Sequence, residues 1–263
     1  MKKIPDDKIA TIILAAGQGK RMKNPDLPKV LCNLNNKPLI EYVLSTAKSI
    51  GTKKIVVVVG HQKEKLIDFL KVKFPEVETC EQAEQLGTGH AVAQAEEYFI
   101  YNSKLVPDYS NDILILAGDV PLISANTLLK FYKAHIDSDA DVSVLSTLAP
   151  DPTGYGRIVR SADKSFQKII EHKDASETEK KINEINSGIF LAKSRLLFAA
   201  LKNVSNKNEQ KEYYLTDIIE ILKRNDAIVR AFPLADFDEL QGVNCVEDLE
   251  RAAASLNKIQ KKN

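Results

Sequence analysis

Cysteine is scarce in this sequence, and its three residues are widely separated. They are Cys32, Cys80 and Cys245, and no Cys-x-x-Cys pair occurs. Because their number is odd and their spacing is irregular, the sequence favours neither a disulfide framework nor a zinc ribbon. We therefore expect a protein of a reducing compartment, the cytoplasm, and no catalytic thiol.

The sequence also lacks an excess of charge of either sign. Lys and Arg number 37 and Asp and Glu number 36, which gives a formal net charge of +1. Such a balance provides no global positive field for nucleic acid or for an anionic membrane, so any bound anion must be held by a local site. A basic surface pattern bearing aromatic residues is not evident either, and we predict no nucleic-acid partner.

Long apolar runs are missing as well. Runs such as Ile55 to Val59 are far too short to span a bilayer, and residues 1–8 lack the apolar core of a signal peptide. We therefore predict no membrane partner. The length of 263 residues, with 44% apolar and 28% charged residues, suits one large α/β domain that needs no disulfide or metal to fold.

Strand-like and helix-like segments alternate through the first 150 residues. The pattern predicts strands at 9–14, 55–59, 77–80, 113–117 and 142–147, and helices at 39–50, 62–71, 88–99 and 124–134. Because the strands are continuous apolar runs, we expect a mostly parallel central sheet that is covered on both faces. Ligands bind such sheets beyond the carboxyl ends of the strands, and the glycines after Leu14 and Ala117 lie at two such ends.

The rhythm changes after Pro150, where strand-like segments become more polar. Strands are predicted at 156–160, 166–172, 185–191 and 228–233, and helices at 194–201, 215–224 and 246–259. We predict a single domain over residues 1–263, with a nucleotide-binding half at about 9–150 and a second substrate-binding half at about 151–250.

The segment from Leu14 to Met22 carries the first chemical signal. Its small residues would let backbone N–H groups approach a phosphate, and Lys20, Arg21 and Lys29 add positive charge. It is not a Walker A loop, because Leu14 stands where that loop begins with glycine. It is not a full dinucleotide fingerprint, because Met22 occupies the third glycine position. The alternative interpretation is a tight turn with solvated lysines.

Eight motifs in a fixed order extend this signal over residues 9–250. They are LAAGQGKRM (14–22) with LPKV (27–30), QAEQLGTGHA (82–91), GDVPL (118–122), PTGYGRI (152–158), EHKDA (171–175), EINSG (184–188), EYYLTD (212–217) and GVN (242–244). Together they resemble the sugar-nucleotide pyrophosphorylases, and in particular the uridyltransferase domain of the bacterial bifunctional N-acetylglucosamine-1-phosphate uridyltransferase/acetyltransferases. One such motif would be weak evidence, whereas eight in order are specific.

The resemblance implies a Rossmann-like nucleotide-diphospho-sugar transferase fold and a defined reaction. That family converts UTP and N-acetylglucosamine 1-phosphate into UDP-N-acetylglucosamine and pyrophosphate with Mg²⁺. A sugar-phosphate oxygen attacks the α-phosphorus in line while pyrophosphate leaves. Catalysis therefore requires positioning and charge neutralisation rather than a nucleophilic triad.

The resemblance also assigns roles to the matching residues. The uridine site would comprise Leu14, Ala15, Ala16, Gly17, Gln82, Gly87 and Thr88, and the sugar site Gly156, Glu171, Asn186, Tyr214 and Thr216. Arg21 would face the leaving phosphates and Lys29 the α-phosphate, as catalytic residues together with Asp119. Asp119 and Asn244 would hold Mg²⁺, which prefers oxygen ligands.

Each assignment has a purely structural alternative. Asp119 could be a cap or turn residue, Asn244 a turn residue, Gly156 a turn glycine and Tyr214 half-buried packing. We interpret His90 and His172 as structural residues within their motifs rather than as acid–base catalysts.

Three features depart from the resembled family. Ala117 stands where many relatives carry Tyr, and the segment between Arg21 and Lys29 looks one residue longer. Only 19 residues follow Asn244, so the left-handed β-helix that performs acetyl transfer and drives trimer formation has no counterpart. We therefore expect no acetyltransferase activity and a monomer or dimer. A separate acetyltransferase is a candidate partner.

Two other functions stay open at this point. One is the same chemistry on a different sugar 1-phosphate, since hydrogen-bonded sugar sites can discriminate by single groups. The other is a nucleotide-sugar-binding protein without turnover. The four residues Arg21, Lys29, Asp119 and Asn244 argue against the second function, because none of them is needed merely for folding.

Overall fold

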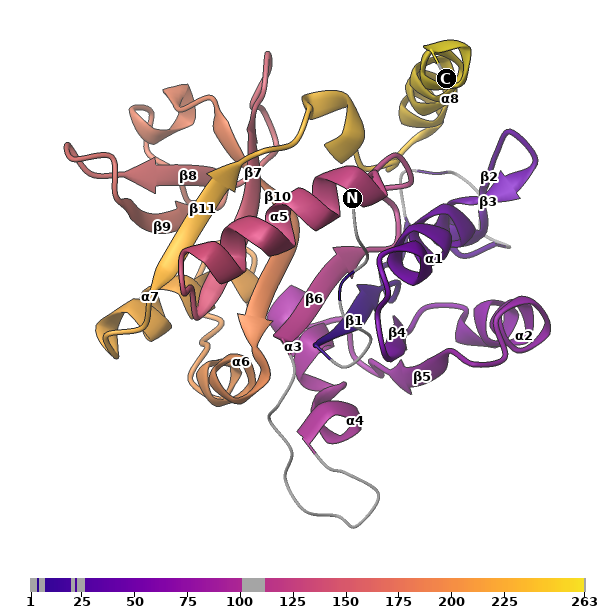
Figure 1. Ribbon diagram of the computed structural model, residues 1–263, viewed down its shortest axis with the longest axis horizontal. Helices are drawn as coiled ribbons and strands as arrows, with labels where there is room; N and C mark the ends of the chain where they lie inside the picture. The colour runs from indigo at the N-terminus through magenta and orange to yellow at the C-terminus, as the bar shows by residue number, and fades with distance from the viewer. Residues whose placement is uncertain (1–3, 5–7, 20–21, 23–26, 101–111, 263) are drawn as a thin grey trace.

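The computed structural model describes residues 4, 8–19, 22, 27–100 and 112–262. A mixed β-sheet with helices on both faces forms its centre (Figure 1). Nine of the described strands form one sheet, whose main path has the order β11-β7-β10-β6-β1-β4-β5. These strands are β1 (Ile9–Leu14), β4 (Ile55–Val59), β5 (Glu78–Glu81), β6 (Asp112–Ala117), β7 (Val142–Leu148), β10 (Glu184–Lys193) and β11 (Val229–Pro233).

Strand direction is parallel along most of this path. β1 pairs in parallel with β4 and β6, β4 pairs in parallel with β5, and β11 pairs in parallel with β7. β10 alone on this path is antiparallel, to both β6 and β7. The expectation of a mostly parallel central sheet in an α/β fold is confirmed.

Alternate residues of the central strands enter two different cores. Ile12 and Ile115 belong to the core on one face, whereas Ile13 and Leu114 belong to the core on the other. Because side chains alternate across a strand, a strand that is buried on both faces must be apolar throughout. This explains why Ile55–Val59 is a continuous run of β-branched residues.

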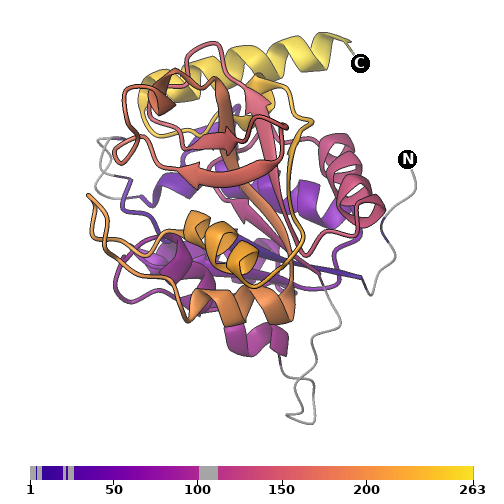
Figure 2. The same ribbon diagram turned by 90° about the vertical axis from the view of Figure 1, so that its left-hand side faces the viewer.

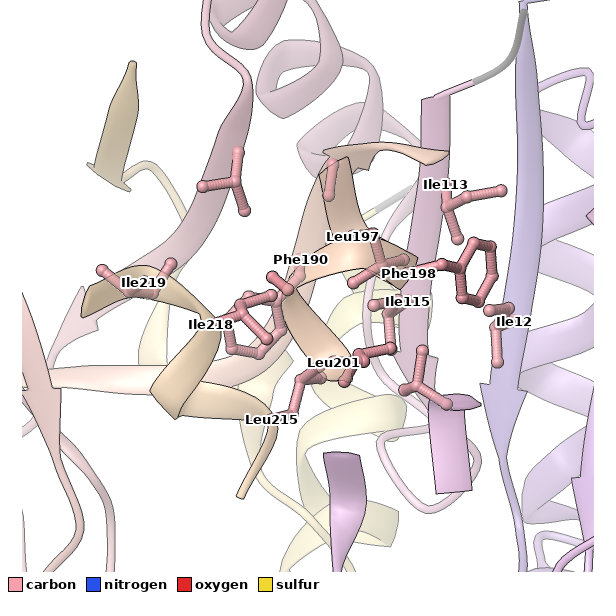
Figure 3. Packing of buried hydrophobic residues seen from close by; sticks show 14 of the residues in the cluster. Ile12, Ile113, Ile115, Phe190, Leu197, Phe198, Leu201, Leu215, Ile218 and Ile219 are labelled. Atoms are coloured by element: carbon pink, nitrogen blue, oxygen red, sulfur yellow. The ribbon is translucent and has the colours of Figure 1, made fainter. Parts of the chain in front are cut away.

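Two helical layers cover these faces. Helices α1 (Leu39–Ser49), α2 (Lys63–Lys73) and α5 (Ala125–Asp137) pack on one face, and α3 (Thr88–Ala93), α4 (Glu96–Ile100), α6 (Ser194–Leu201) and α7 (Ile218–Arg224) on the other. Figure 3 shows Phe190 of β10 beside Ile218 of α7, and Phe198 of α6 beside Ile12 of β1 and Ile113 of β6. α5 begins at a Ser124 cap, whose Oγ accepts a hydrogen bond from Thr127 N at 3.1 Å.

The predicted helix over 88–99 is two helices, α3 and α4. The Gln94 side chain donates to His90 O at 3.1 Å, and Ala95 N bonds back three residues to Val92 O at 3.1 Å. This tighter turn ends the regular α-helical ladder after Ala93. The helix predicted at 215–224 likewise begins as a 3₁₀ turn, η4 (Leu215–Asp217), before α7.

Smaller elements complete the described chain. β8 (Arg157–Arg160) pairs with β10 and with β9 (Phe166–Ile170), which ends two residues before the predicted end. The short turns are η2 (Lys29–Leu31), η3 (Glu179–Lys181) and η5 (Phe237–Leu240), and a hairpin joins β2 (Asn33–Leu34) to β3 (Lys37–Pro38).

The last helix, α8 (Val246–Lys262), stands apart from both helical layers. It lies along one edge of the molecule in both views (Figures 1 and 2). Its residue Ala252 packs in a third, smaller apolar cluster with Leu34 and Val243. Within the described residues, no helix has the length and apolar character needed to cross a membrane.

Candidate active site

Two cavities meet at the carboxyl ends of the central strands. The first has a volume of about 460 Å³, and all seven residues predicted for the uridine site line it: Leu14, Ala15, Ala16, Gly17, Gln82, Gly87 and Thr88. Lys29 and Asp119 line the same cavity. The structure thus brings together residues from four separate chain segments at the position where open α/β sheets bind ligands.

The loop after β1 forms one wall of this cavity. Ala15 N donates to Val58 O of β4 at 2.9 Å, which continues the parallel pairing past the end of β1. Gly19 has a φ of +58°, and a Cβ there would lie 2.8 Å from Lys29 Cβ. Glycine is therefore required where the loop passes Lys29. Arg21, the predicted partner of the leaving phosphates, lies outside the described residues, as does most of the 21–29 segment.

Gln82 forms the opposite wall and is almost fully buried, with 4% exposure. Its Nε2 atom donates to Gly87 O at 3.0 Å and lies 3.1 Å from His90 Nδ1. The two hydrogens of this amide are therefore both engaged, and the Oε1 oxygen is left as an acceptor. His90 thus contacts the Gln82 amide, and its interpretation as a structural residue stays a prediction.

Thr88 connects this wall to the second half of the chain. Its Oγ1 accepts a hydrogen bond from Leu215 N at 3.1 Å, and Gly89 N donates to Tyr213 O at 2.8 Å. Gly87 has a φ of +111°, and a Cβ there would lie 2.7 Å from Tyr213 O. A side chain at this position would separate α3 from the segment that leads into η4.

Lys29, Asp119 and Asn244 converge at one end of the cavity. The Lys29 ammonium forms an ion pair with Asp119 Oδ2 and donates to Asn244 Oδ1 at 3.0 Å. Asp119 follows the end of β6, where Gly118 N donates to Leu14 O at 2.9 Å. Asp248 of α8 fixes the Asn244 backbone, because its Oδ2 accepts from Asn244 N at 2.8 Å.

The donor set of this end fits a hard divalent cation. A carboxylate and an amide oxygen lie around a single positive charge, the Lys29 ammonium. Mg²⁺ is typically held by one or two protein oxygens, and phosphate and water supply its other ligands. Among the described residues, at this site as elsewhere, no group of three or more His, Cys, Asp or Glu side chains is placed to hold a metal ion.

The predicted sugar residues form a neighbouring cluster around Glu171. Thr216 Oγ1 donates to Glu171 Oε1 at 3.2 Å, and a Cβ on Gly156 would lie 3.3 Å from that same oxygen. Asn186 N donates to Gly156 O at 2.9 Å. Burial raises the pKa of Glu171 above its ordinary value, although the hydrogen bond from Thr216 opposes this shift. The carboxylate is thus poorly solvated, and its oxygens are of the kind that accept hydrogen bonds from hydroxyl groups.

Tyr214 precedes η4 and is buried. Its hydroxyl accepts a hydrogen bond from Gln210 Nε2 at 2.8 Å. Burial raises the pKa of Tyr214 to about 12, so its hydroxyl stays protonated. The sequence did not single out Gln210, and no motif marks it.

The second cavity, of about 520 Å³, adjoins the first. Ala117 and Asp119 border both cavities, so the departure at Ala117 lies at their junction. The rings of Tyr155 and Phe237, which line the second cavity, are in edge-on contact with centroids 6.0 Å apart. Phe237 was missed by sequence reasoning because it belongs to no motif.

Comparisons with known proteins identify relatives of this chain. A family model described as "MobA-like NTP transferase domain" matches residues 11–211. The chain is 43% identical over 90% of its length to the bifunctional protein GlmU of Bacillus subtilis, and 43% identical over 89% to that of Latilactobacillus sakei. It spans about half the length of these relatives.

Solved structures show the same fold. A UDP-glucose pyrophosphorylase complexed with UDP-glucose superposes with a TM-score of 0.76 at 18% identity, covering 95% of this chain and 98% of that protein. The fold is thus that of a known α/β pyrophosphorylase, and the family match covers most of the chain. The chain therefore belongs to the family of MobA-like NTP transferase domains.

Proposed function

We propose that this protein is a UTP-dependent N-acetylglucosamine-1-phosphate uridylyltransferase, which forms UDP-N-acetylglucosamine and pyrophosphate. One observation carries the proposal. The cavity lined by the seven predicted uridine residues ends at the Lys29, Asp119 and Asn244 cluster. The similarity to the GlmU proteins supports uridylyl transfer as the reaction.

Gln82 would help to distinguish uracil from cytosine. Because its amide hydrogens are already donated to Gly87 O and His90 Nδ1, it presents only an acceptor oxygen. Uracil offers one ring N–H donor, which this oxygen would accept. Cytosine carries no hydrogen on that ring nitrogen, so a CTP substrate in the same pose would place an acceptor against the acceptor oxygen of Gln82.

Lys29 would neutralise charge that develops on the α-phosphate. In this structure its ammonium contacts Asp119 and Asn244, and a bound nucleotide offers it phosphate oxygens instead. Asp119 and Asn244 would hold Mg²⁺, which when bound neutralises the nucleotide phosphates and orients them. The attacking sugar-phosphate oxygen is already ionised, so no general base is required.

Glu171 would position the acceptor sugar. Its poorly solvated carboxylate accepts hydrogen bonds from sugar hydroxyls, and Thr216 holds it in place. Gly156 packs directly against this carboxylate, because a Cβ there would lie 3.3 Å from Glu171 Oε1. Asn186 and Tyr214 complete the proposed sugar site.

A second candidate is the same reaction with a bulkier sugar 1-phosphate. The small side chain of Ala117 at the junction of the two cavities supports it. The second cavity offers an aromatic pair and polar groups, which are the groups that bind carbohydrate. A panel of sugar 1-phosphates decides between the two candidates.

The test is pyrophosphate release by the purified protein with UTP, N-acetylglucosamine 1-phosphate and Mg²⁺. We expect release that stops with EDTA, and that falls by roughly a hundredfold or more in Asp119→Ala at unchanged thermal stability. Release with another sugar 1-phosphate only would favour the second candidate. UTP binding in calorimetry without release for any sugar would overturn both and leave a non-catalytic binding protein.

A further inference from the structure

Arg157, at the start of β8, is a fully buried charged side chain, with 0% exposure. A guanidinium remains charged in proteins, so its burial is costly unless it is paired. Across the described chain, no carboxylate forms an ion pair with Arg157, and its Nε has no hydrogen-bond partner. Such an arrangement needs a reason other than stability.

Arg160 on the same strand shows the contrast. Its guanidinium makes two hydrogen bonds of 2.7 Å to the two oxygens of Glu184. This is the usual paired geometry of arginine with a carboxylate. The two arginines of this strand therefore have different partners, and Arg157 rather than Arg160 contacts the segments that carry Gly156 and Glu171.

Arg157 instead binds neutral acceptors from three separate segments. Nη1 donates to Tyr155 O, in the turn that carries Gly156. Nη2 lies 3.2 Å from His172 Nδ1, in the residue after Glu171, and 3.4 Å from Lys180 O in η3. Since a guanidinium only donates, His172 Nδ1 must be the acceptor, and the ring proton is then on Nε2.

These segments carry two sides of the sugar cluster. Gly156 follows Tyr155, and Glu171 precedes His172, both of which Arg157 contacts. The two residues lie close together, because a Cβ on Gly156 would lie 3.3 Å from Glu171 Oε1. The planar guanidinium fixes several acceptors at set directions at once, which the single ammonium of a lysine cannot do.

We propose that Arg157 is a positioning residue for the acceptor sugar, because it holds the Gly156 turn and the Glu171–His172 segment at the separation at which Glu171 meets the sugar hydroxyls. The identity of the ligand rests on the proposed function. The arrangement of the three segments does not depend on it.

The test measures what the sugar adds to binding rather than turnover. Calorimetry with Mg²⁺ gives the dissociation constants of UDP and of UDP-N-acetylglucosamine. The UDP constant divided by the UDP-sugar constant is the ratio that reports how much the sugar contacts add to binding. For Arg157→Met we expect this ratio to fall by roughly tenfold or more, while the UDP constant stays within about twofold. Arg157→Lys should recover part of the ratio.

Two further variants separate positioning from general stability. Arg160→Met removes the other arginine of β8. We expect this variant to have a lower melting temperature and an unchanged ratio. His172→Asn keeps an acceptor near the Nδ1 position, and His172→Leu removes it. We expect His172→Asn to retain the ratio and His172→Leu to reduce it. These two variants test the positioning role even if Arg157→Met does not fold.

The outcomes distinguish this inference from the proposed function. Equal losses of UDP and UDP-sugar affinity in Arg157→Met, or the same loss of ratio in Arg160→Met, would overturn the positioning role. A wild-type protein that releases no pyrophosphate yet shows an Arg157-dependent ratio would overturn the proposed function and leave the positioning role standing.

Discussion

At the scale of a single residue, Lys29 has two alternative sets of partners, protein oxygens and phosphate oxygens. In this structure its ammonium bridges Asp119 and Asn244, the two oxygen donors proposed for Mg²⁺. A divalent cation at those oxygens would have to displace it, because two positive charges cannot share one small site. Under the proposed function, Lys29 would thus be both a competitor for the cation and a ligand for phosphate.

This competition predicts a change in metal affinity. In Lys29→Met, we expect the free protein to bind Mn²⁺ roughly tenfold more tightly or better, since the ammonium no longer occupies the oxygens. Pyrophosphate release should fall at the same time, because the variant lacks the Lys29 ammonium that would neutralise the α-phosphate. Electron paramagnetic resonance of free Mn²⁺ measures the affinity without substrates.

A matched lysine tests whether the effect is local. Lys133→Met removes an ammonium that pairs with Asp137 on the exposed surface of α5. Its Mn²⁺ affinity and turnover should both equal those of the wild type. Unchanged Mn²⁺ binding in Lys29→Met would show that Lys29 does not compete for these oxygens.

At the scale of elements, the contact between α3 and the chain before η4 depends on Gly87. A methyl group there would lie 2.7 Å from Tyr213 O and 2.9 Å from Tyr213 N. Backbone atoms cannot move aside as a flexible side chain can, and a φ of +111° is strained for any residue with a Cβ.

Gly87→Ala should therefore weaken both folding and nucleotide binding. We expect the free energy of unfolding in urea to fall by about 1–3 kcal/mol, and UTP affinity to fall because Thr88 shifts with the helix. Gly17→Ala is the control for stability. A Cβ on Gly17 would meet no atom within 4 Å, so its unfolding free energy should be unchanged.

Sequence patterns predicted the elements better than their arrangement. The strands β1, β4 and β6 could be recognised because burial on both faces makes them apolar throughout. The reversed direction of β10 could not, since a run such as Ile189, Phe190 and Leu191 is equally apolar in either direction. Pairing partners, rather than local pattern, determine strand direction.

The sequence motifs predicted which residues belong to the site, but not which of them contact one another. Asp119 and Asn244 meet through Lys29, which lies 215 residues before Asn244 in sequence. No periodicity encodes such a contact, and only the resemblance placed these residues together. Arg157 had no assigned role, because a buried guanidinium without a carboxylate partner is visible only in three dimensions.

At the scale of the whole molecule, the two halves of the chain share one sheet. β10, from residues 184–193, lies between β6 and β7 of the first half, and β11 pairs with β7. Neither half could bury its own strands without the other. On this ground we propose that residues 1–263 form one domain, which urea unfolding should reveal as a single transition.

A buried histidine at the β7–α5 interface couples the stability of this unit to pH. His135 is 1% exposed, its Nδ1 lies 2.7 Å from Ser143 Oγ, and its Nε2 lies 4.0 Å from Asp112 Oδ2. Burial, together with the nearby charge of Lys193, lowers the pKa of His135 from 6.5 to about 4, although Asp141 opposes this shift. The unfolded chain therefore binds a proton between about pH 6.5 and pH 4 that the folded protein does not.

This difference makes His135 destabilising as the pH falls through that window. Asp217 acts in the opposite direction, because burial raises its pKa to about 6 and the folded state then takes up the extra proton. The net pH profile of the wild type mixes both effects. A comparison with a variant that lacks the imidazole isolates the contribution of His135.

His135→Asn should cost stability at neutral pH, where the buried neutral imidazole packs well. As the pH falls from about 7.5 to about 5, the wild type should lose about 2 kcal/mol relative to this variant, because only the wild-type unfolded state gains the proton. Urea denaturation at a series of pH values measures the difference. Parallel curves for the two proteins would mean that His135 is protonated in the folded state, in conflict with its burial beside Ser143.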